Sequence, residues 1–589
     1  MQKRGNRMQI YKLATHEALQ VMRARIRSIR NSFAKPPVPK RLLLAPQDLK
    51  TADPTIAQDI YSGYYVFEGR SVKTEGQSPF LAAPPSLAWA EELYGFSWLR
   101  HLRAAGTALA QANARALVRE FLEGMGYSKA YFANETQVVS RCLISFICQS
   151  PLILDGADHP FYMDFMQALG KMVRKLEYDV RYHSVPYRRL QAAIALCYAG
   201  LCCEGLETVL KKANRYLENE LNNQILVDGG HISRNPRHLV DLLLDLLPLR
   251  QIYISRGQTI LPSLQQTIDR MLPMLRLFRF PDGTLAHFNG MGITATDHLA
   301  TLLMYDEVRA KPNLHTPYSG YARIEACTTV MVADIGGPPP TLSSAEACAG
   351  CLSFEFASGT SRLVVNCGIP YSASDALSLA ARSTAAHSTL SPNHTPQFDF
   401  LNTKENKVSK KITSFLMKQI GPVILSAQPE VTCQRDESPH STQIIASHDA
   451  YRDQYGFIHQ RKWNLHNEGN TLQGEDTLIF DEGRKLEEPL TIRFHLAPDI
   501  RANIVPSGQT VIMELPNSEV WQFSCELHEP QLEESMFFSV TDGVRHTEQI
   551  VLYLFPEENP NILWRFDRIR EAKNISQNIN ELDLEPLLQ

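Results

Sequence analysis

The chain has 589 residues, of which 44% are hydrophobic and 21% are charged, and its formal net charge is −4. At about 100–200 residues per domain this length exceeds a single ordinary domain, and the composition is typical of globular proteins with a sizeable core. The slightly acidic balance excludes a general nucleic-acid-binding protein, because that function requires a basic surface.

The N-terminal part of the chain has a different charge balance from the rest. Residues 1–41 carry eleven Lys and Arg against a single acid, Glu17, and residues 10–33 have the pattern of a basic amphipathic helix. This pattern predicts either a solvated arm or a segment that docks on an anionic surface such as a membrane or a polyanion. Residues 1–84 as a whole are predicted to be an arm or a wrapping segment, not a core of their own.

Targeting signals and cysteine usage bear on the compartment. Arg23, Arg25 and Arg27 interrupt any apolar run after the basic start, so we predict no secretory signal, and no apolar stretch of about 20 residues could span a bilayer. The 11 cysteines lie among apolar residues, as reduced core cysteines do, and the lone pair Cys348 and Cys351 is interpreted as strand cysteines. These features predict a cytoplasmic protein, with the periplasm or cell envelope as the alternative.

Residues 85–314 are predicted to form a helical domain. Apolar residues recur there at helical spacing in segments separated by short Gly, Pro or Asn breaks. The segments are Ser86–Ala105, Thr107–Gly124, Glu135–Cys148, Phe161–Val180, Tyr187–Gly200, Cys203–Leu221, Pro236–Leu247 and Leu261–Phe278. Such a succession predicts an α/α array or toroid of antiparallel helix pairs.

Residues 315–589 are predicted to form a β domain, because the apolar period changes to two. The predicted strands are Thr329–Asp334, Leu352–Phe356, Ser361–Asn366, Gln443–Ala446, Ile458–Leu465, Leu490–Leu496, Thr510–Leu515, Trp521–Glu526 and Gln549–Phe555. Many short strands between turns indicate an antiparallel sandwich, and the polar residues 393–411 indicate a long loop.

Three histidines of this half, His387, His459 and His495, lie in segments that have the pattern of β-strands, and two of them stand beside an arginine. A neutral imidazole can accept a proton or bind a metal, and a neighbouring guanidinium can hold an anion. His387 could therefore be a base or a metal-supporting group, with a hydrogen-bonded strand histidine as the alternative. His459 could bind a metal, with Arg461 on the same strand face. His495, between two large apolar residues, is interpreted as structural.

The order of these motifs resembles the heparinase II/III-like proteins, a group of polysaccharide lyases. The matching segments are Asp228-Gly-Gly-His231, Asp282-Gly283 with Phe288-Asn289-Gly290, Arg382-Ser-Thr-Ala-Ala-His387-Ser-Thr389, Tyr451 to Arg461, and Arg493-Phe-His495-Leu-Ala-Pro-Asp499. The resemblance covers about residues 85–555 and implies an α/α-toroid followed by a β-sandwich.

The resemblance also implies a reaction. Family lyases cleave acidic polysaccharides by β-elimination at a uronate: a base removes the C5 proton, an acid protonates the oxygen leaving C4, and the carboxylate is neutralised. Members commonly use a toroid Asn or His for the carboxylate, a toroid Tyr as acid and base, and a sandwich His as base. By this resemblance His387 would be the base, and His459 would help to bind a divalent metal, zinc or calcium, in the sandwich.

The toroid half departs from the family pattern. The helix that should carry the Asn begins Ser184-Val-Pro-Tyr187-Arg188-Arg189 and has none, and Arg237 stands where a tyrosine is expected. His231 and Tyr187 remain as catalytic candidates in this half. The candidates for binding the substrate carboxylate are Arg188, Arg234, Arg237, His238, Asn289 and, from the sandwich, Arg461. Arginine can neutralise a carboxylate, but it cannot be a general acid at neutral pH.

The sequence therefore predicts a lyase acting on a uronate-containing acidic glycan in a cleft between the two domains. The alternative is a non-catalytic glycan-binding or envelope-polysaccharide assembly protein on the same scaffold, since a fold does not guarantee chemistry. A metal-assisted hydrolase is a third hypothesis, and it would differ from a lyase in leaving no unsaturated sugar.

Overall fold

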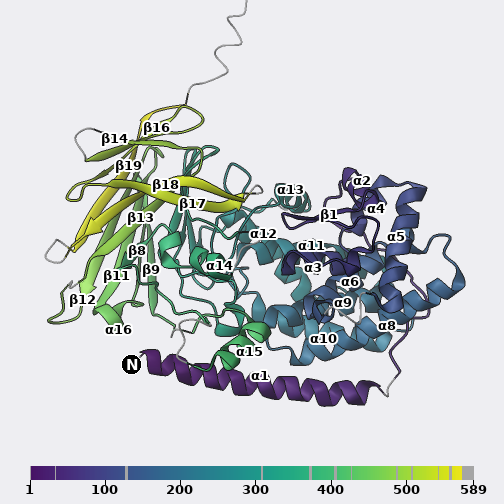
Figure 1. Cartoon of the computed structure of the whole chain (residues 1–589). Coiled ribbons are helices and arrows are strands. Elements are labelled where there is room, and N and C mark those ends of the chain that lie inside the picture. Colours follow the sequence, from purple (N-terminus) through teal and green to yellow (C-terminus); the bar gives the residue numbers. More distant parts are fainter. Residues whose placement is uncertain are drawn as a thin grey trace, which may run out of the picture.

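The computed structural model describes residues 2–572 except for gaps at 33–34, 126–130, 307–308, 371–374, 403–407, 426–427, 486–487, 506–508, 541–542 and 556–559. The described residues form a helical lobe and a β lobe side by side (Figure 1). The predicted fold class, an α/α-toroid followed by an antiparallel β-sandwich, is confirmed.

The helical lobe consists of antiparallel helices joined by short turns. Its helices are α3 (Leu87–Gly95), α4 (Leu99–Ala105), α5 (Ala108–Glu120), α6 (Thr136–Cys148), α7 (Ser150–Leu154), α8 (His159–Tyr182), α9 (Pro186–Cys202), α10 (Glu207–Gln224), α11 (Pro236–Ser255), α12 (Pro262–Phe278) and α13 (Thr296–Met304). Side-chain caps begin several of them: Asp158 accepts from the Phe161 amide at 2.8 Å, and Asn235 caps α11 in the same way. The single helix predicted over 86–105 is wrong, because Phe96 is left-handed (φ 56°) and separates α3 from α4.

The β lobe consists of two antiparallel sheets packed face to face. One has the order β14-β15-β16-β19-β12-β11-β10-β9, and the other has β17-β18-β13-β7-β6-β5-β4-β3 with β8 beside β13. The strands are β3 (His315–Thr316), β4 (Tyr321–Ala326), β5 (Thr329–Asp334), β6 (Phe354–Ser358), β7 (Ser361–Val365), β8 (Leu390–Pro392), β9 (Val431–Glu437), β10 (Ser441–His448), β11 (Phe457–His466), β12 (Thr471–Phe480), β13 (Leu490–Leu496), β14 (Arg501–Ile504), β15 (Thr510–Glu514), β16 (Val520–Cys525), β17 (Gln531–Val540), β18 (Gly543–Leu554) and β19 (Asn561–Arg570). Inward-facing aromatic and aliphatic side chains of both sheets form one buried core between them.

The N-terminal segment packs along the outside of both lobes. Helix α1 (Gln2–Ser32) lies against α15 (Lys410–Ile420), a helix that begins at the end of the segment 393–411 predicted as a loop (Figure 1). The chain then reaches α2 (Thr55–Tyr61) and the hairpin of β1 (Tyr64–Phe67) and β2 (Arg70–Lys73), whose apolar side packs on the toroid core. Short helices α14 (Asp375–Ala381) and α16 (Arg452–Tyr455) lie in connections of the β lobe. Within the described residues, no helix has the length and apolarity that crossing a bilayer would require.

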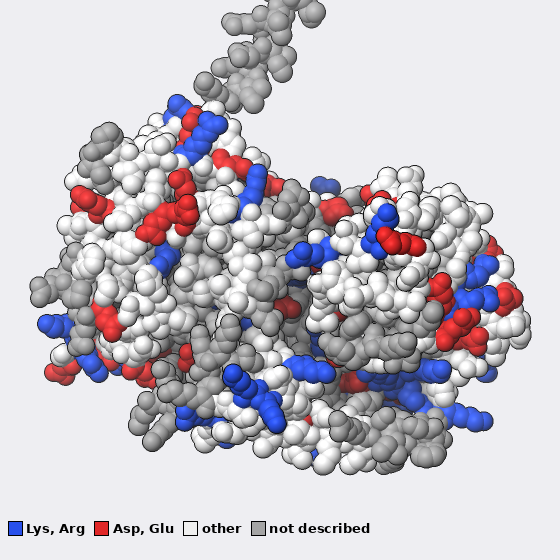
Figure 2. Space-filling model, viewed as in Figure 1, with Lys and Arg blue, Asp and Glu red and all other residues white. Residues whose placement is uncertain are grey.

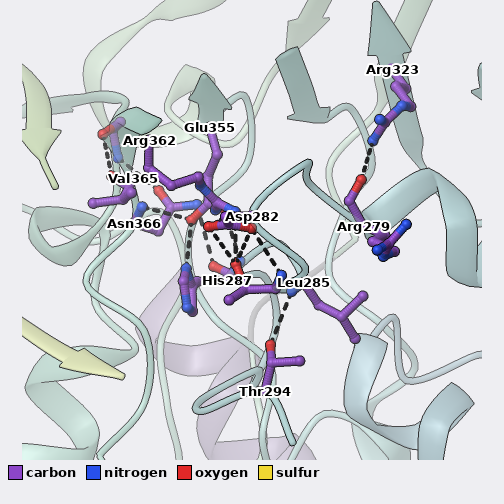
Figure 3. A network of polar contacts seen from close by, with 12 residues as sticks. Arg279, Asp282, Leu285, His287, Thr294, Arg323, Glu355, Arg362, Val365 and Asn366 are labelled. Atoms are coloured by element: carbon purple, nitrogen blue, oxygen red, sulfur yellow. Dashed lines mark hydrogen bonds and ion pairs between the residues drawn. The ribbon is translucent and has the colours of Figure 1, made fainter. Parts of the chain in front are cut away.

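A buried polar network joins the last toroid loop to the sandwich (Figure 3). Glu355 on β6 is fully buried and accepts hydrogen bonds from the His287 amide and ring, from the Asn366 amide and from the guanidinium of Arg362. Arg362 also donates to Thr284 in the toroid loop at 3.2 Å. Because each of these groups is buried, the network holds the two lobes in one relative orientation.

Candidate functional site

A cleft of about 1150 Å³ lies between the two lobes. Helices α3, α6, α9 and α11 line its toroid side, residues 345–346 and Arg382 line its sandwich side, and residues 50–53 and 66–69 of the N-terminal segment close it. The hollow is visible between the lobes in Figure 2, with charged side chains of both signs around it. Clefts at domain boundaries are the usual place for ligand sites.

Four of the predicted toroid residues meet at this cleft: Tyr187, Arg188, Arg237 and His238. The rings of Tyr187 and His238 are stacked, with centroids 3.9 Å apart and planes 13° apart. Both aromatic side chains begin helices, α9 and α11, and each helix start carries a proline that fixes the chain there. We call these four residues, together with the Glu346 carboxylate, the cleft floor.

Glu346 supplies the negative charge of the cleft floor. Its Oε2 lies 3.2 Å from His238 Nε2 and accepts from the Asn235 amide at 2.7 Å, while Ser233 Oγ contacts His238 Nδ1 at 2.7 Å. Partial shielding from water would raise the pKa of Glu346, but His238 and the nearby arginines outweigh it and lower the pKa well below its usual range. Glu346 is therefore ionised at neutral pH. No motif in the sequence pointed to it.

Tyr187 holds its proton firmly. Burial raises the pKa of its phenol well above 10, and the carboxylate of Asp241 adds to the rise. At neutral pH the phenol can donate a hydrogen bond or a proton, but it is a poor base. Arg188 and Arg237 both line the cleft. Arg188 donates to the Gln191 side chain at 3.1 Å, and the half-exposed Arg237 has its Nε 3.8 Å from Asp241 Oδ2.

The lining of the cleft is not cationic overall. Eight Asp and Glu and six Lys and Arg line it, namely Asp53, Glu68, Glu91, Glu92, Asp241, Asp245, Asp297 and Glu346 against Lys50, Arg100, Arg141, Arg188, Arg237 and Arg382. Several cations are already committed: Arg141 makes a two-pronged ion pair with Asp245 at 2.8 and 2.7 Å. A polyanion would meet more negative than positive groups in this cleft, which disfavours its binding.

Three toroid residues predicted for the site are buried and do not line the cleft, namely His231, Asn289 and Arg234. His231 is 1% exposed, and both of its ring nitrogens are used: Nδ1 accepts from the Ser233 amide and Nε2 donates to Gln224 Oε1 at 3.0 Å. Burial lowers the pKa of His231 well below 6.5. Asn289, 2% exposed, donates to the Tyr321 hydroxyl at 2.7 Å and to Asp334 at 3.0 Å.

Arg234, the third, connects the two lobes. Its guanidinium is buried, pairs with Asp334 at 2.5 Å, and donates to backbone carbonyls of the β lobe, including those of Gly320 and Gly336. Both glycines are needed, because a Cβ on either would approach Arg234 within 2.9 Å. Every donor direction of this guanidinium faces the protein, so it cannot bind a ligand carboxylate.

His387, the predicted base, does not line the cleft. Its side chain is 3% exposed and Nδ1 donates to the Ser383 carbonyl at 2.7 Å, which leaves the lone pair on Nε2. Burial lowers the pKa of His387 to about 4, so the ring is neutral but weakly basic. Its neighbour Arg382 does line the cleft, and donates to the carbonyls of Ala347 and Ser344.

Arg461, predicted to bind substrate, is fully buried in the sandwich and does not line the cleft. It pairs with Asp476 through Nε at 2.6 Å and Nη2 at 2.9 Å, and His459 Nε2 donates to the same carboxylate at 2.6 Å. The His459 Nδ1 lies 3.3 Å from Nε2 of His448. Burial would raise the pKa of Asp476, but Arg461 and His459 reverse the effect and lower it.

The residues around His459 do not fit a divalent metal. The guanidinium of Arg461 already provides the positive charge beside Asp476, and both nitrogens of His459 are used in hydrogen bonds. Across the part of the chain that the structure describes, no group of three or more His, Cys, Asp and Glu side chains is arranged to hold a metal ion. His495 is buried, with Nε2 on the Ala385 carbonyl at 3.0 Å and Nδ1 on Ser535 at 2.7 Å, which agrees with its structural interpretation.

The fold and the cleft define the class of protein: an α/α-toroid with a β-sandwich, of the polysaccharide-lyase type. Residues 309–565 match the family described as Heparinase II/III-like, C-terminal. The crystal structure of heparinase III has a TM-score of 0.67 at 13% identity and covers 86% of this chain and 81% of that chain. The heparan sulfate lyase HepC from Pedobacter heparinus has a TM-score of 0.56 at 15% identity, covering 95% and 89%.

A relative matches over nearly the whole length. It is FtsZ-localized protein C of Caulobacter vibrioides (strain NA1000 / CB15N), which is 29% identical over 546 residues, 90% of this chain and 91% of that protein. The matched family covers the β lobe, and heparinase III shares the fold of both lobes. The solved lyases share its fold, and at 13–15% identity that likeness leaves the reaction open.

Proposed function

We propose that this heparinase II/III-like protein binds an acidic saccharide without cleaving it, and that it localises with FtsZ. The first part rests on the cleft floor. The Tyr187 phenol keeps its proton and is stacked on the His238 ring, whose Nε2 faces the Glu346 carboxylate. The second part rests on the relative that matches across both lobes.

Elimination requires a base within hydrogen-bond reach of the C5 proton. The pKa of Tyr187 is raised, so its phenol keeps its proton at neutral pH and cannot accept another. Both ring nitrogens of the buried His231 are engaged in hydrogen bonds. His387 does not line the cleft, and its pKa is about 4. None of the three combines accessibility with basicity. Binding needs no base. Arg188 and Arg237, which line the cleft, can hold a carboxylate.

The charge balance of the cleft narrows the ligand. Because carboxylates outnumber Lys and Arg in the lining, the cleft suits a short saccharide with one carboxylate per sugar among its hydroxyls, not a densely sulfated polyanion. A single carboxylate would contact Arg188 and Arg237, and Tyr187 and Glu346 would bond to sugar hydroxyls.

Helix α1 supports contact with an anionic lipid surface. Along one side it exposes a stripe of large apolar residues at helical spacing: Met8, Tyr11, Leu19, Met22 and Ile26. The excess of eleven basic residues over one acid in residues 1–41 complements an anionic surface. We therefore propose that α1 docks there, and that the protein acts in the cytoplasm, as its sequence predicts.

Two measurements test the proposal. A fluorescent fusion imaged together with labelled FtsZ should localise with it, and the two purified proteins should bind each other; diffuse fluorescence and no binding would end the FtsZ part. Calorimetry with oligogalacturonates should show binding that Arg237→Ala weakens by about tenfold, as expected for one charged hydrogen bond. Equal affinity of both proteins would remove the cleft assignment.

Catalytic β-elimination is the second candidate. The convergence of Tyr187, His238, Glu346 and Arg188 at one point of the cleft favours it, since these groups could donate a proton and neutralise a carboxylate. Ultraviolet absorbance of unsaturated uronates distinguishes the two. A time-dependent rise with an acidic polysaccharide, lost in Tyr187→Phe, would establish a lyase and overturn the non-catalytic proposal.

A further inference from the structure

Helix α15 lies beside α1 and covers the same apolar cluster. Ile10 of α1 and Leu416 and Ile420 of α15 belong to this cluster and are at most 3% exposed. Further apolar side chains of both helices pack at its margin, namely Leu13, Ala14, Ile412 and Phe415. Because each helix turns its buried side towards one cluster, the outward sides of both helices lie on the same flank of the molecule (Figure 1).

The outward side of α15 is basic. Lys411, Ser414 and Lys418 are exposed, and their spacing of three and four residues puts them on one side of the helix. Lys410 is exposed next to them, and the sequence of α15 contains no Asp or Glu. Figure 2 shows Lys and Arg side chains on the lower part of the molecule, over the places that α1 and α15 take in Figure 1.

Two of these lysines stand where they do not help their own helix. Lys410 and Lys411 are the first two residues of α15, at the end of the helix that carries partial positive charge. Cations at this end oppose the helix dipole, so the stability of α15 does not explain them. The excess positive charge is instead available to an anionic partner outside the protein.

The neighbouring part of α1 provides the apolar component of the same flank. Met8 and Tyr11 are 60% and 50% exposed, and the basic side chains of Arg7 and Lys12 beside them are exposed as well. Large apolar side chains flanked by cations are typical of helices that lie in the interface of an anionic membrane. The lysines of α15 add positive charge at the side of this helix, at the level of the lipid headgroups.

We propose that α15 is a second contact of the protein with an anionic lipid surface, where Lys410 and Lys411 bind the phosphate groups of lipids while α1 inserts its apolar stripe. This inference rests on the proposed docking of α1 and adds a second element to it. A single helix lying on a bilayer can rotate about its own axis. A basic contact at its side restricts that rotation, so α15 sets the direction in which the cleft faces relative to the lipid surface.

Sedimentation of the full chain with vesicles tests the proposal. Vesicles of phosphatidylglycerol and phosphatidylcholine are compared with vesicles of phosphatidylcholine alone. The variant Lys410→Gln/Lys411→Gln is compared with Lys73→Gln/Lys311→Gln, a control that removes two exposed lysines outside α1 and α15. One lysine near an anionic surface strengthens binding about fivefold, so the α15 variant should bind the anionic vesicles about thirtyfold more weakly, and the control should bind nearly as the wild type does. The difference should shrink as salt is added.

Tryptophan fluorescence reports the contact directly. The five native tryptophans are at most 2% exposed, so an added surface tryptophan is read without competition from other exposed ones. Ser414→Trp places it on the outward side of α15, and Ser71→Trp places it on the exposed side of β2, whose hairpin lies far from α1 in Figure 1. A spin label on the lipid headgroup should quench Ser414→Trp on bound vesicles and leave Ser71→Trp unchanged.

Each outcome decides between the two contacts. Without vesicles, Lys410→Gln/Lys411→Gln should unfold at the wild-type temperature or above it, and a clearly lower temperature would show that the lysines are structural and overturn the proposal. Vesicle binding equal to that of the control, or no quenching of Ser414→Trp, overturns the contact of α15 and leaves the docking of α1, which Leu19→Ser tests in the same assay. If the wild type does not bind anionic vesicles, both contacts are wrong, whereas calorimetry of Arg237→Ala still tests saccharide binding.

Discussion

Arg234 and Arg237 stand three residues apart, yet the structure gives them opposite roles, and Arg234→Met tests this assignment. The substitution retains most of the side-chain volume but removes the guanidinium paired with the buried Asp334 and leaves several carbonyls without their donor. Removing one partner of a buried ion pair costs about 3–5 kcal/mol. The matched control, Arg237→Met, removes a half-exposed pair at 3.8 Å and should cost at most about 1 kcal/mol.

The effect of pH on this variant follows from Asp334. Burial raises its pKa, and Arg234 offsets part of the rise, so without Arg234 the pKa rises further. An acid whose folded pKa is raised binds its proton more tightly when folded, and the folded state gains relative stability as the pH falls through that pKa. The deficit of Arg234→Met should therefore be largest near pH 7 and shrink towards pH 5.

Chemical denaturation followed by tryptophan fluorescence measures both effects. Because the chain is large and has two lobes, the first transition is compared between variants instead of one global value. Arg234→Met should lower its midpoint strongly, and Arg237→Met hardly at all. A reversed order, or a deficit of Arg234→Met that grows as the pH falls, would refute the assignment of Arg234 to the interface.

Three further predictions concern the sandwich and the cleft floor. Arg461→Met should destabilise the sandwich by about 3–5 kcal/mol, because Asp476 would remain buried and ionised. Dialysis against a chelator should leave the unfolding temperature of the wild type unchanged, and a drop of several degrees would reveal a metal. Burial lowers the pKa of His387 to about 4, so the folded protein favours the neutral ring. About 3 kcal/mol of the free energy of unfolding should therefore be lost as the pH falls from 6.5 to 4. His387→Gln should lack this part of the pH dependence, and the same slope of stability against pH in both proteins would contradict the assignment. Tyr187→Phe keeps the stack on His238 and should leave the unfolding temperature unchanged while weakening oligogalacturonate binding several-fold; a large stability loss would show that the phenol is structural.

The element pattern was predictable where the local sequence carries the signal, as a helical apolar period or as a short apolar run between turn residues. The strands β5 and β13 are predicted with both ends correct, and each is buried at every position. The prediction failed where long-range contacts override periodicity. Residues 543–548 of β18 are mostly exposed and extend beyond the predicted strand, because they pair with β17 in a projecting ribbon without an apolar pattern of their own.

The site was only partly predictable for a related reason. Tyr187, Arg188, Arg237 and His238 lie at helix starts that the motifs located, and the fold brings them together. The direction of a side chain could not be predicted in the same way. Arg234 has a left-handed backbone (φ 61°), and this turn directs its guanidinium into the β lobe. Glu346 belongs to no motif, so only the fold can place its carboxylate beside His238 in the cleft.

The sandwich histidines are held in place by hydrogen bonds to one another and to Asp476. The Ala450 amide donates to His448 Nδ1 at 3.2 Å, so the proton of a neutral His448 ring lies on Nε2 and points to His459 Nδ1 at 3.3 Å. His459 then carries its own proton on Nε2 and donates it to Asp476, which also receives Arg461 and the indole of Trp564 at 2.8 Å. Because an unsatisfied polar group at this depth is costly, replacing any single member would leave its neighbour unpaired, and the motif is held in place by the stability of the fold even where no ligand or metal requires it.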